Sequence, residues 1–291
     1  MQGQMQISAD LEALSTAAAK RWVALASEAI AARGEFHAAL SGGATPRRLY
    51  ERLAAAPFAR AIDWLCVHIY FTDERCVPPD HQDSNFHMAS EALLRHVLIP
   101  PEQIHRIGVT LAYIRQDAAA YAELLRKHLP KSVAPGILPP VPYREERQRR
   151  VLPMSQEAGC RERPTLVRPC TSKEGVPQFD LVLLGLGPDG HIASLFPAAG
   201  IAVTEREDRY AVAVYADRLK AWRISLSLPV IAHAKHILML AAGKEKAEVV
   251  RRALGAPESP PLPVQRLQPV HEMEWYLDEA AAAQLRDRVN G

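Results

Sequence analysis

Two side chains that can carry out acid–base chemistry, Asp189 and His191, stand two residues apart in a glycine-rich stretch. This stretch, "GLGPDGHIAS", directly follows the apolar run "DLVLL" of residues 180–184. A turn that glycines hold open keeps such polar groups accessible, whereas burying them is costly. A histidine oriented by a carboxylate can accept a proton from water, so His191 is a candidate general base and Asp189 its partner. The alternative is a capped turn with a surface histidine.

The same stretch offers groups that could receive negative charge as water attacks a carbonyl. The glycine N–H groups of the turn are such donors, and so is the hydroxyl of Ser194 at the predicted start of the next helix. The pattern G-x-S-x-G is absent, which argues against the nucleophile elbow of the α/β-hydrolases.

A second glycine turn, in "LSGGATPRRLY", could bind an anion. Gly42 and Gly43 lie between a predicted strand and a predicted helix, where backbone N–H groups and the helix N-terminus favour negative charge. Thr45 adds a hydroxyl donor. Neither GxxxxGK[ST] nor GxGxxG occurs, so the turn is neither a P-loop nor a dinucleotide fingerprint. A simple tight connection is the alternative.

A third polar loop, "FTDERCVPPDHQDSNF", brings Asp73 and Arg75 directly after an apolar strand. An arginine there could grip a phosphate or a carboxylate in bidentate fashion. His81, Asp83 and His87 suggest a metal site, but the segment "DSN" (83–85) is more typical of a helix cap, and we predict no metal. A solvated turn is the alternative for the charged triplet.

Two further cations fall near predicted strand–helix junctions. Arg223 opens the strand "RISLSL", and Lys244 follows Gly243 where "HILMLAAG" meets its helix. Each could be an ordinary surface residue, but a phosphate-bearing substrate would explain both.

The elements that position these residues alternate along the chain. Helical periodicity or helix caps predict seven helices. The first spans 11–29 and ends before Gly34, and the second begins at residue 45. The others span 84–98, 113–129, 229–235, 244–254 and 278–289, and Asp278 is the predicted cap of the last. Apolar, β-branched segments predict strands over 35–40, 64–71, 180–186, 210–215, 223–228 and 236–243. Alternation with strands apolar on both faces predicts an α/β fold with a parallel sheet covered on two sides. The loops at 41–46, 72–76 and 187–194 should then converge at the carboxyl ends of the strands.

Composition restricts the class of protein. The length of 291 residues fits one large domain or two small ones, and 48% hydrophobic and 23% charged residues are typical of an ordinary globular protein. A net charge of +2 does not favour nucleic acid. No apolar run reaches the roughly 20 residues of a membrane span, and the N-terminus does not read as a secretory signal. Cys66, Cys76, Cys160 and Cys170 have no CxxC spacing, which predicts free thiols in a reducing cytoplasm. A small molecule is the expected partner.

Residues 131–178 break the pattern. They hold eight of the 23 prolines, nine Lys/Arg and five Asp/Glu, a net charge of +4, and show no sustained periodicity. Unstructured loops beyond about 15 residues are uncommon inside compact domains, so we expect a flexible surface insertion. A basic tether for an anionic partner is the alternative.

Five motifs resemble the 6-phosphogluconolactonases in order and character. They are "LSGGATPRRLYERL", "FTDERCVPPDHQDSNF", "FDLVLLGLGPDGHIASLFP", "RISLSLPVIAHAKHILMLAAGKEKAEVV" and "WYLDEAA". The resemblance covers nearly the whole chain except 131–178. Two positions depart from the lactonase pattern: Ile192 replaces the usual Thr, as in the related glucosamine-6-phosphate deaminases, and Ala44 replaces a common Ser.

The resemblance implies hydrolysis of 6-phospho-D-glucono-1,5-lactone to 6-phospho-D-gluconate, the second step of the oxidative pentose phosphate pathway. It also implies a single-domain, Rossmann-like fold with helices on both faces of the sheet, and no metal or organic cofactor. We expect a cytoplasmic monomer or weak homo-oligomer. Among the site residues it makes His191 the activator of water and Asp189 its polar neighbour. The residues it implies for sugar-phosphate binding are Gly42, Gly43, Thr45, Arg75, Arg223 and Lys244. The residue types and positions of Asp73 and Ser194 add these two to the predicted substrate-binding residues.

Two other functions stay open. A glucosamine-6-phosphate-type isomerase/deaminase would use Asp73 to move a proton between neighbouring carbons and would release ammonia. A non-catalytic sugar-phosphate sensor would bind without turnover, although no helix-turn-helix extension is evident.

Overall fold

A parallel six-stranded sheet forms the centre of the computed structural model, which describes residues 4–132, 175–197, 209–217 and 219–288. The strand order is β1-β11-β10-β7-β2-β3, and every neighbouring pair runs parallel. The strands span Gln4–Ser8 (β1), Phe36–Leu40 (β2), Val67–Phe71 (β3), Leu181–Gly185 (β7), His236–Ala241 (β10) and Glu272–Asp278 (β11). This confirms the predicted open, mostly parallel α/β fold.

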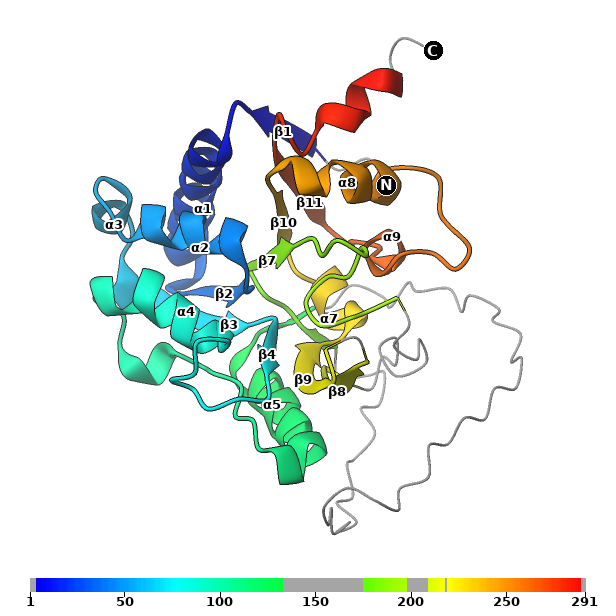
Figure 1. Ribbon diagram of the computed structural model, residues 1–291. Coiled ribbons are helices and arrows are strands. Elements are labelled where there is room, and N and C mark those ends of the chain that lie inside the picture. The colour runs from blue at the N-terminus through cyan, green and yellow to red at the C-terminus, as the bar shows by residue number, and fades with distance from the viewer. Residues whose placement is uncertain (1–3, 133–174, 198–208, 218, 289–291) are drawn as a thin grey trace, which may run out of the picture.

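Helices cover the sheet from two sides (Figure 1). They are α1 (Leu11–Arg33), α2 (Ala44–Leu53), α3 (Phe58–Ala61), α4 (Asn85–Ala92), α5 (Ile114–His128), α7 (Leu228–Ala232), α8 (Ala247–Ala253) and α9 (Pro263–Arg266). Short 3₁₀ helices span Trp64–Cys66, Leu94–His96, Pro101–Gln103, Leu111–Tyr113, Lys244–Lys246 and Ala283–Arg288. In Figure 1, α1 and α2 lie on one side of the sheet and α7 and α9 on the other. No helix of the described part combines the length and apolar character that a membrane span requires.

Local sequence signals explain the elements that carry the site. The central strands β2 and β7 are buried almost throughout, in keeping with their apolar residues on both faces. Helix α1 begins after Asp10, whose carboxylate accepts the N–H of Ala13 at 2.8 Å. It ends at Gly34, which adopts a left-handed φ of 82°, as the sequence predicted.

Two of the predicted strands belong to a different sheet. Residues Asp73–Arg75 (β4), Ala211–Ala216 (β8) and Ala221–Leu226 (β9) form an antiparallel sheet of order β4-β9-β8 that packs beside α5 (Figure 1). The segments 210–215 and 223–228, predicted as strands, do form strands. Their separate antiparallel sheet was not predicted, because local apolar character does not determine which partner a strand finds.

Two other expectations need correction, and two strands were missed. The strand expected over 64–71 begins at Val67, after a 3₁₀ turn. The helix expected over 278–289 is a 3₁₀ helix, Ala283–Arg288; Asp278 ends β11, although its carboxylate does accept the N–H of Ala281. Strands β1 and β11 were not predicted. The edge strand β1 is largely exposed and therefore lacks the apolar alternation of a half-buried strand.

The two ends of the predicted insertion lie together. Lys131–Ser132 (β5) pairs antiparallel with Val176–Pro177 (β6), so the chain leaves the domain and returns at one place. Residues 133–174 lie outside the described residues, and a single domain with a flexible insertion stays a prediction. Cys66 and Cys76 are free thiols; Cys160 and Cys170 also fall outside the description.

Candidate active site

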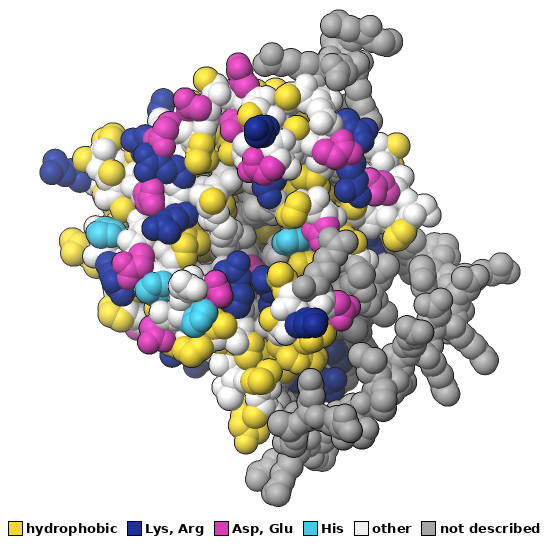
Figure 2. Space-filling model, in the orientation of Figure 1, with side chains coloured by type: hydrophobic (Ala, Val, Ile, Leu, Met, Phe, Trp, Pro, Cys, Tyr) yellow, Lys and Arg dark blue, Asp and Glu magenta, His cyan; other side chains and the backbone are white. Residues whose placement is uncertain are grey.

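The loops that follow β2, β3, β7 and β10 meet at the carboxyl edge of the large sheet. The carbonyl of Gly42 lies 3.7 Å from the place of a Cβ on Gly185, so the loop after β2 touches the end of β7. On the other side of β7, Lys246 Nζ donates to the carbonyl of Leu186 at 2.7 Å. The prediction that polar loops converge at this edge is confirmed. In Figure 2, a histidine and an acidic side chain lie side by side near the middle of this face, with Lys and Arg side chains around them.

Asp189 orients His191 within what we term the histidine turn, residues 187–191. The ring atom Nδ1 of His191 lies 2.5 Å from Oδ1 of Asp189, and the two side chains are 26% and 21% exposed. Burial is the largest single influence on the pKa of Asp189 and acts to raise it. The side-chain hydrogen bond and electrostatic interaction with His191, together with backbone hydrogen bonds, outweigh burial and lower that pKa to about 2. The carboxylate is therefore ionised at neutral pH. Because Nδ1–H of a neutral ring donates to it, Nε2 is left as the acceptor.

Two positions of the histidine turn require or favour glycine, and one of them makes room for this ring. A Cβ on Gly187 would lie 2.1 Å from His191 Nδ1, so only glycine fits there. Gly190 has φ of 85°, a conformation that favours glycine. The ring also packs against Phe196, with centroids 4.7 Å apart. Ile192, the departure from the lactonase pattern, is fully buried below the turn and does not reach the crevice.

The second turn, residues 41–43, is named here the glycine turn. Tyr50 fixes its start, because the phenol accepts the N–H of Ser41 at 3.0 Å and donates to the Ser41 carbonyl at 2.8 Å. Gly43 has φ of 106° and immediately precedes α2. Thr45 lies in the first turn of that helix. The first N–H groups of α2 therefore face the crevice edge, as an anion site requires.

Asp73 is buried and accepts hydrogen bonds from several side chains, instead of lying exposed in a loop. It is 4% exposed, and its Oδ2 accepts the hydroxyl of Ser194 at 2.5 Å. The hydroxyl of Thr72 donates to Oδ1 at 3.2 Å. Ser194 is itself fully buried in a turn, so its hydroxyl is committed to Asp73 instead of facing the crevice. The Asp73–Ser194 hydrogen bond, which the sequence did not predict, thus joins the loop after β3 to the residues that follow the histidine turn.

Two arginines stand opposite each other on the small sheet. Arg75 on β4 pairs in register with Arg223 on β9. Arg75 donates to the carbonyl of Asp83 at 2.6 Å, and Arg223 lies 3.8 Å from Asp73 Oδ2. Burial lowers the pKa of Arg223, and the nearby Arg75 lowers it further, against the carboxylates that raise it. Nε of both guanidiniums is buried without a partner among the described residues. Two adjacent cations with unused donors suit an anion.

Lys246, which the sequence analysis did not single out, lies at the carboxyl edge of the sheet. Its half-buried ammonium lies at the end of β7, and burial lowers its pKa while Glu245 and Asp189 oppose that shift. The sequence-predicted Lys244 is exposed at the first position of the 3₁₀ helix Lys244–Lys246. Spacing along the chain did not distinguish the two, because the direction of each side chain depends on the turn at Gly243, whose φ is 96°.

A cavity of about 420 Å³ opens beside Asp189. Arg252, the cation in its lining, is held by both carboxylate oxygens of Glu258 at 2.7 and 2.8 Å. That guanidinium is therefore already neutralised, and the Arg75–Arg223 pair and Lys246 are the better cations for a phosphate. The cavity is lined by Pro188, Asp189, Pro197, Arg252, Glu258, Ser259, Pro260 and Leu262.

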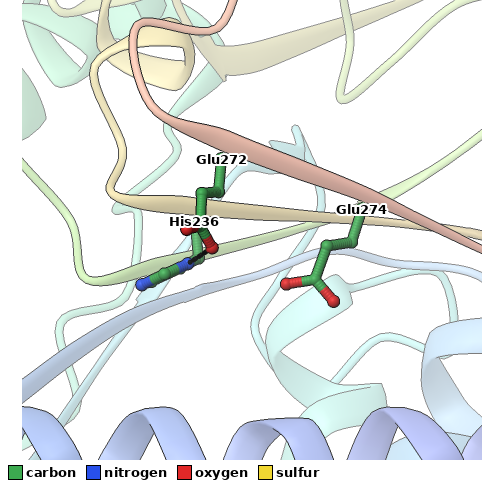
Figure 3. Close-up of side chains that lie close together, drawn as sticks. All are labelled: His236, Glu272 and Glu274. Atoms are coloured by element: carbon green, nitrogen blue, oxygen red, sulfur yellow. Dashed lines mark ion pairs between the residues drawn. The ribbon is translucent and has the colours of Figure 1, made fainter. Parts of the chain in front are cut away.

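One group with the spacing of metal ligands occurs within the described residues, far from the crevice. His236, Glu272 and Glu274 project from the amino-terminal parts of β10 and β11 (Figure 3). Arg21 on α1 donates to Glu274 at 2.7 Å and to Glu272 at 3.1 Å, so a guanidinium already balances both carboxylates. We therefore interpret the group as an ion-pair network between α1 and the sheet.

A family profile described as glucosamine-6-phosphate isomerases/6-phosphogluconolactonase matches residues 9–275. The chain belongs to this family. The resemblance carried by the five motifs is thus confirmed, and the match extends over most of the chain.

Curated members of the family match this chain over most of its length. The 6-phosphogluconolactonase of Mycobacterium tuberculosis is 32% identical over 286 residues, which cover 98% of this chain and 99% of that protein. The chloroplastic 6-phosphogluconolactonase 3 of Arabidopsis thaliana is 32% identical over 255 residues, 87% of this chain. This chain spans 66% of the length of the Arabidopsis protein.

Solved structures of family members share the architecture. The 6-phosphogluconolactonase from Trypanosoma brucei superposes with a TM-score of 0.74 at 26% identity, covering 98% of this chain and 99% of that chain. A monomeric glucosamine-6-phosphate deaminase reaches a TM-score of 0.69 at 18% identity, with 97% of this chain and 99% of that chain covered, which indicates a common fold alone.

Proposed function

We propose that this chain is a 6-phosphogluconolactonase, which hydrolyses 6-phospho-D-glucono-1,5-lactone to 6-phospho-D-gluconate in the oxidative pentose phosphate pathway. The observation that carries the proposal is the Asp189–His191 pair, whose Oδ1 and Nδ1 atoms lie 2.5 Å apart in the turn where the polar loops of this chain converge. The match to the family profile supports the same function. The near-complete match to the mycobacterial protein of that name supports it.

His191 acts as general base. Its Nε2 accepts a proton from water, and the resulting hydroxide forms a bond to C1 of the lactone. Asp189 keeps Nδ1–H oriented and stabilises the imidazolium as it forms. The tetrahedral intermediate then breaks its bond to the ring oxygen, which leaves as a hydroxyl after taking the proton from Nε2. Water is thus divided between the new carboxyl group and the released hydroxyl, and no covalent enzyme intermediate forms.

Cationic and N–H donors bind the phosphate and the growing negative charge. The glycine turn offers backbone N–H groups at the start of α2, with Thr45 beside them. Arg75 and Arg223 provide paired guanidiniums with unused Nε donors. Lys246 replaces Lys244 as the lysine of the site, because its ammonium lies at the end of β7. Asp73 and Ser194 hold the loops together, since both are buried and bonded to each other.

Lactone hydrolysis is the direct test. Glucose-6-phosphate dehydrogenase generates the lactone in place, and its disappearance is compared with the spontaneous rate in the presence and absence of this protein. Acceleration in proportion to protein concentration is expected. A folded protein that gives no acceleration contradicts the proposal. Ammonia release from glucosamine 6-phosphate would then assign the chain to the isomerase/deaminase branch, with Asp73 as the candidate base.

A further inference from the structure

Asn85, the first residue of α4, occupies the space between the glycine turn and Asp73. It is 1% exposed, yet neither composition nor motif spacing assigned it a function beyond a helix cap. Its side chain bonds to the loop after β3 and touches the loop after β2. It therefore stands where two loops of the site meet.

The orientation of the Asn85 amide follows from its neighbours. Nδ2 lies 2.8 Å from the carbonyl oxygen of Asp73 and 3.3 Å from Oδ1 of the same residue. Both of these atoms are acceptors, so the amide nitrogen must face them. Oδ1 of Asn85 then points the other way, toward the glycine turn, and has no partner among the described residues.

The glycine turn is seated directly on this amide. A Cβ on Gly42 would lie 1.9 Å from Asn85 Oδ1 and 2.7 Å from Asn85 Cγ. Gly42, unlike Gly43, does not have a left-handed φ, so contact with Asn85 explains the glycine better than backbone strain does. The turn can approach Asp73 this closely only because residue 42 has no side chain.

Asn85 itself has little freedom to move. The carboxylate of Glu74 accepts the N–H of Asn85 at 2.8 Å, the N–H of Phe86 at 2.9 Å and the hydroxyl of Ser84 at 3.0 Å. Glu74 is 3% exposed, and the start of α4 is therefore anchored to β4 from within. The side chain that separates the two loops is a fixed spacer.

We propose that Asn85 is the positioning residue that sets the distance between the glycine turn and the histidine turn. The connection runs from Gly42 through Asn85 to Asp73, and from Asp73 Oδ2 to Ser194, three residues after His191. The inference rests on the proposed function, in which the first turn holds the phosphate and the second carries the base. Asn85 touches neither the substrate nor the reacting atoms.

Substitutions at position 85 test this role through kinetics. Asn85→Ala removes the spacer, and Asn85→Asp keeps its shape but places a carboxylate against the acceptors of Asp73. Misplacement of reacting groups by about 1 Å can cost about 10²-fold in rate, so we expect kcat to fall by 10-fold or more in both variants. Ser15→Ala is the matched control, because Ser15 is also fully buried with an unpartnered hydroxyl but lies on α1. Its kcat should stay at the wild-type value.

The contact predicts a reciprocal effect at Gly42. Gly42→Ala alone should lower kcat/KM by 10-fold or more, because its methyl group collides with the Asn85 amide. In Gly42→Ala/Asn85→Ala the collision is gone, so the second substitution should cost much less than it does in the wild type. Gly108→Ala is the control, since nothing lies within 4 Å of a Cβ there. Strictly additive losses in the double variant would overturn the proposal.

Hydrogen–deuterium exchange gives a readout that does not depend on turnover. In Asn85→Ala, peptides that contain residues 41–43 and 190–195 should both exchange faster than in Ser15→Ala. Unchanged exchange in either loop overturns the positioning role, whatever the kinetics show. Wild-type protein that fails to hydrolyse the lactone refutes the proposed function instead, and the exchange comparison then decides the role of Asn85 separately.

Discussion

The hydroxyl of Ser194 donates a 2.5 Å hydrogen bond to Oδ2 of Asp73, joining two loops that are 121 residues apart in the chain. Both residues are buried, so the bond forms away from water. A buried carboxylate needs such donors, and Thr72 and Asn85 supply the others. The arrangement makes Asp73 and Ser194 part of the frame of the site.

Ser194→Ala should destabilise the fold as well as the activity. Losing a buried hydrogen bond to a charged acceptor costs about 1.5–3 kcal/mol in the free energy of unfolding. Ser227→Ala is the matched control, because that buried hydroxyl has no partner among the described residues and its removal should change little. Urea titrations of the two variants measure the difference. Equal free energies of unfolding for Ser194→Ala and Ser227→Ala would contradict the structural role of Ser194.

The Asp189–His191 pair predicts a loss confined to the chemical step. His191→Ala should lower kcat by about 10²–10⁴-fold, the usual contribution of a general base, with KM little changed. Asp189→Asn should lower kcat less, since it keeps the hydrogen-bonding shape but removes the ionised partner whose pKa of about 2 keeps it charged. Steady-state kinetics of both variants check this. A rise in KM alone would remove His191 from the role of base.

Lys244 and Lys246 form a matched pair within one short turn. Lys246→Ala should raise KM for the lactone by about 10-fold, equivalent to about 1.4 kcal/mol of binding energy, because its ammonium lies at the crevice. Lys244→Ala, which removes the same charge from an exposed position, should leave KM close to the wild-type value. The reverse pattern would return the phosphate contact to Lys244.

The sequence was sufficient to locate the site but not to orient its side chains. Apolar strands such as 180–184 followed by glycine-rich turns placed the polar loops at one sheet edge, because parallel strands all end there. The choice between Lys244 and Lys246 depends on a single backbone turn, and the role of Asn85 depends on contacts with residues 12 and 43 positions away. Neither leaves a periodic signal in the chain.

The sequence also did not predict which strands pair with one another. The segment 223–228 has the same apolar character as a strand of the large sheet, yet β9 pairs antiparallel with β4 and β8. This pairing is what brings Arg223 opposite Arg75. The two arginines side by side are the strongest indication of an anion site here. Their proximity could be seen only in the structure, because it depends on this strand pairing.

A cluster of histidines at the amino-terminal ends of β2 and β3 predicts acid sensitivity. The ring of His105 stacks on Tyr70, and its Nε2 lies 3.2 Å from His68 Nδ1. The ring of His128, at the end of α5, lies beside His105 in a tilted arrangement, with centroids 4.9 Å apart. His37 lies beside His68, and Glu35 reaches His37 at 3.0 Å. Burial, with the nearby His128, His68 and His37 adding to it, lowers the pKa of His105 to about 4.

The lowered pKa of His105 should make the fold less stable in acid. In the unfolded chain the pKa of His105 is near its ordinary 6.5, so between pH 6.5 and about 4 the unfolded state binds more protons. The free energy of unfolding should therefore fall as the pH falls through this window, by up to about 3 kcal/mol from this residue. His105→Gln, which keeps an acceptor for His68 but does not titrate, should flatten the dependence. Urea titrations at pH 7, 6, 5 and 4 measure it, and an equally steep loss in the variant would exclude His105 as the source.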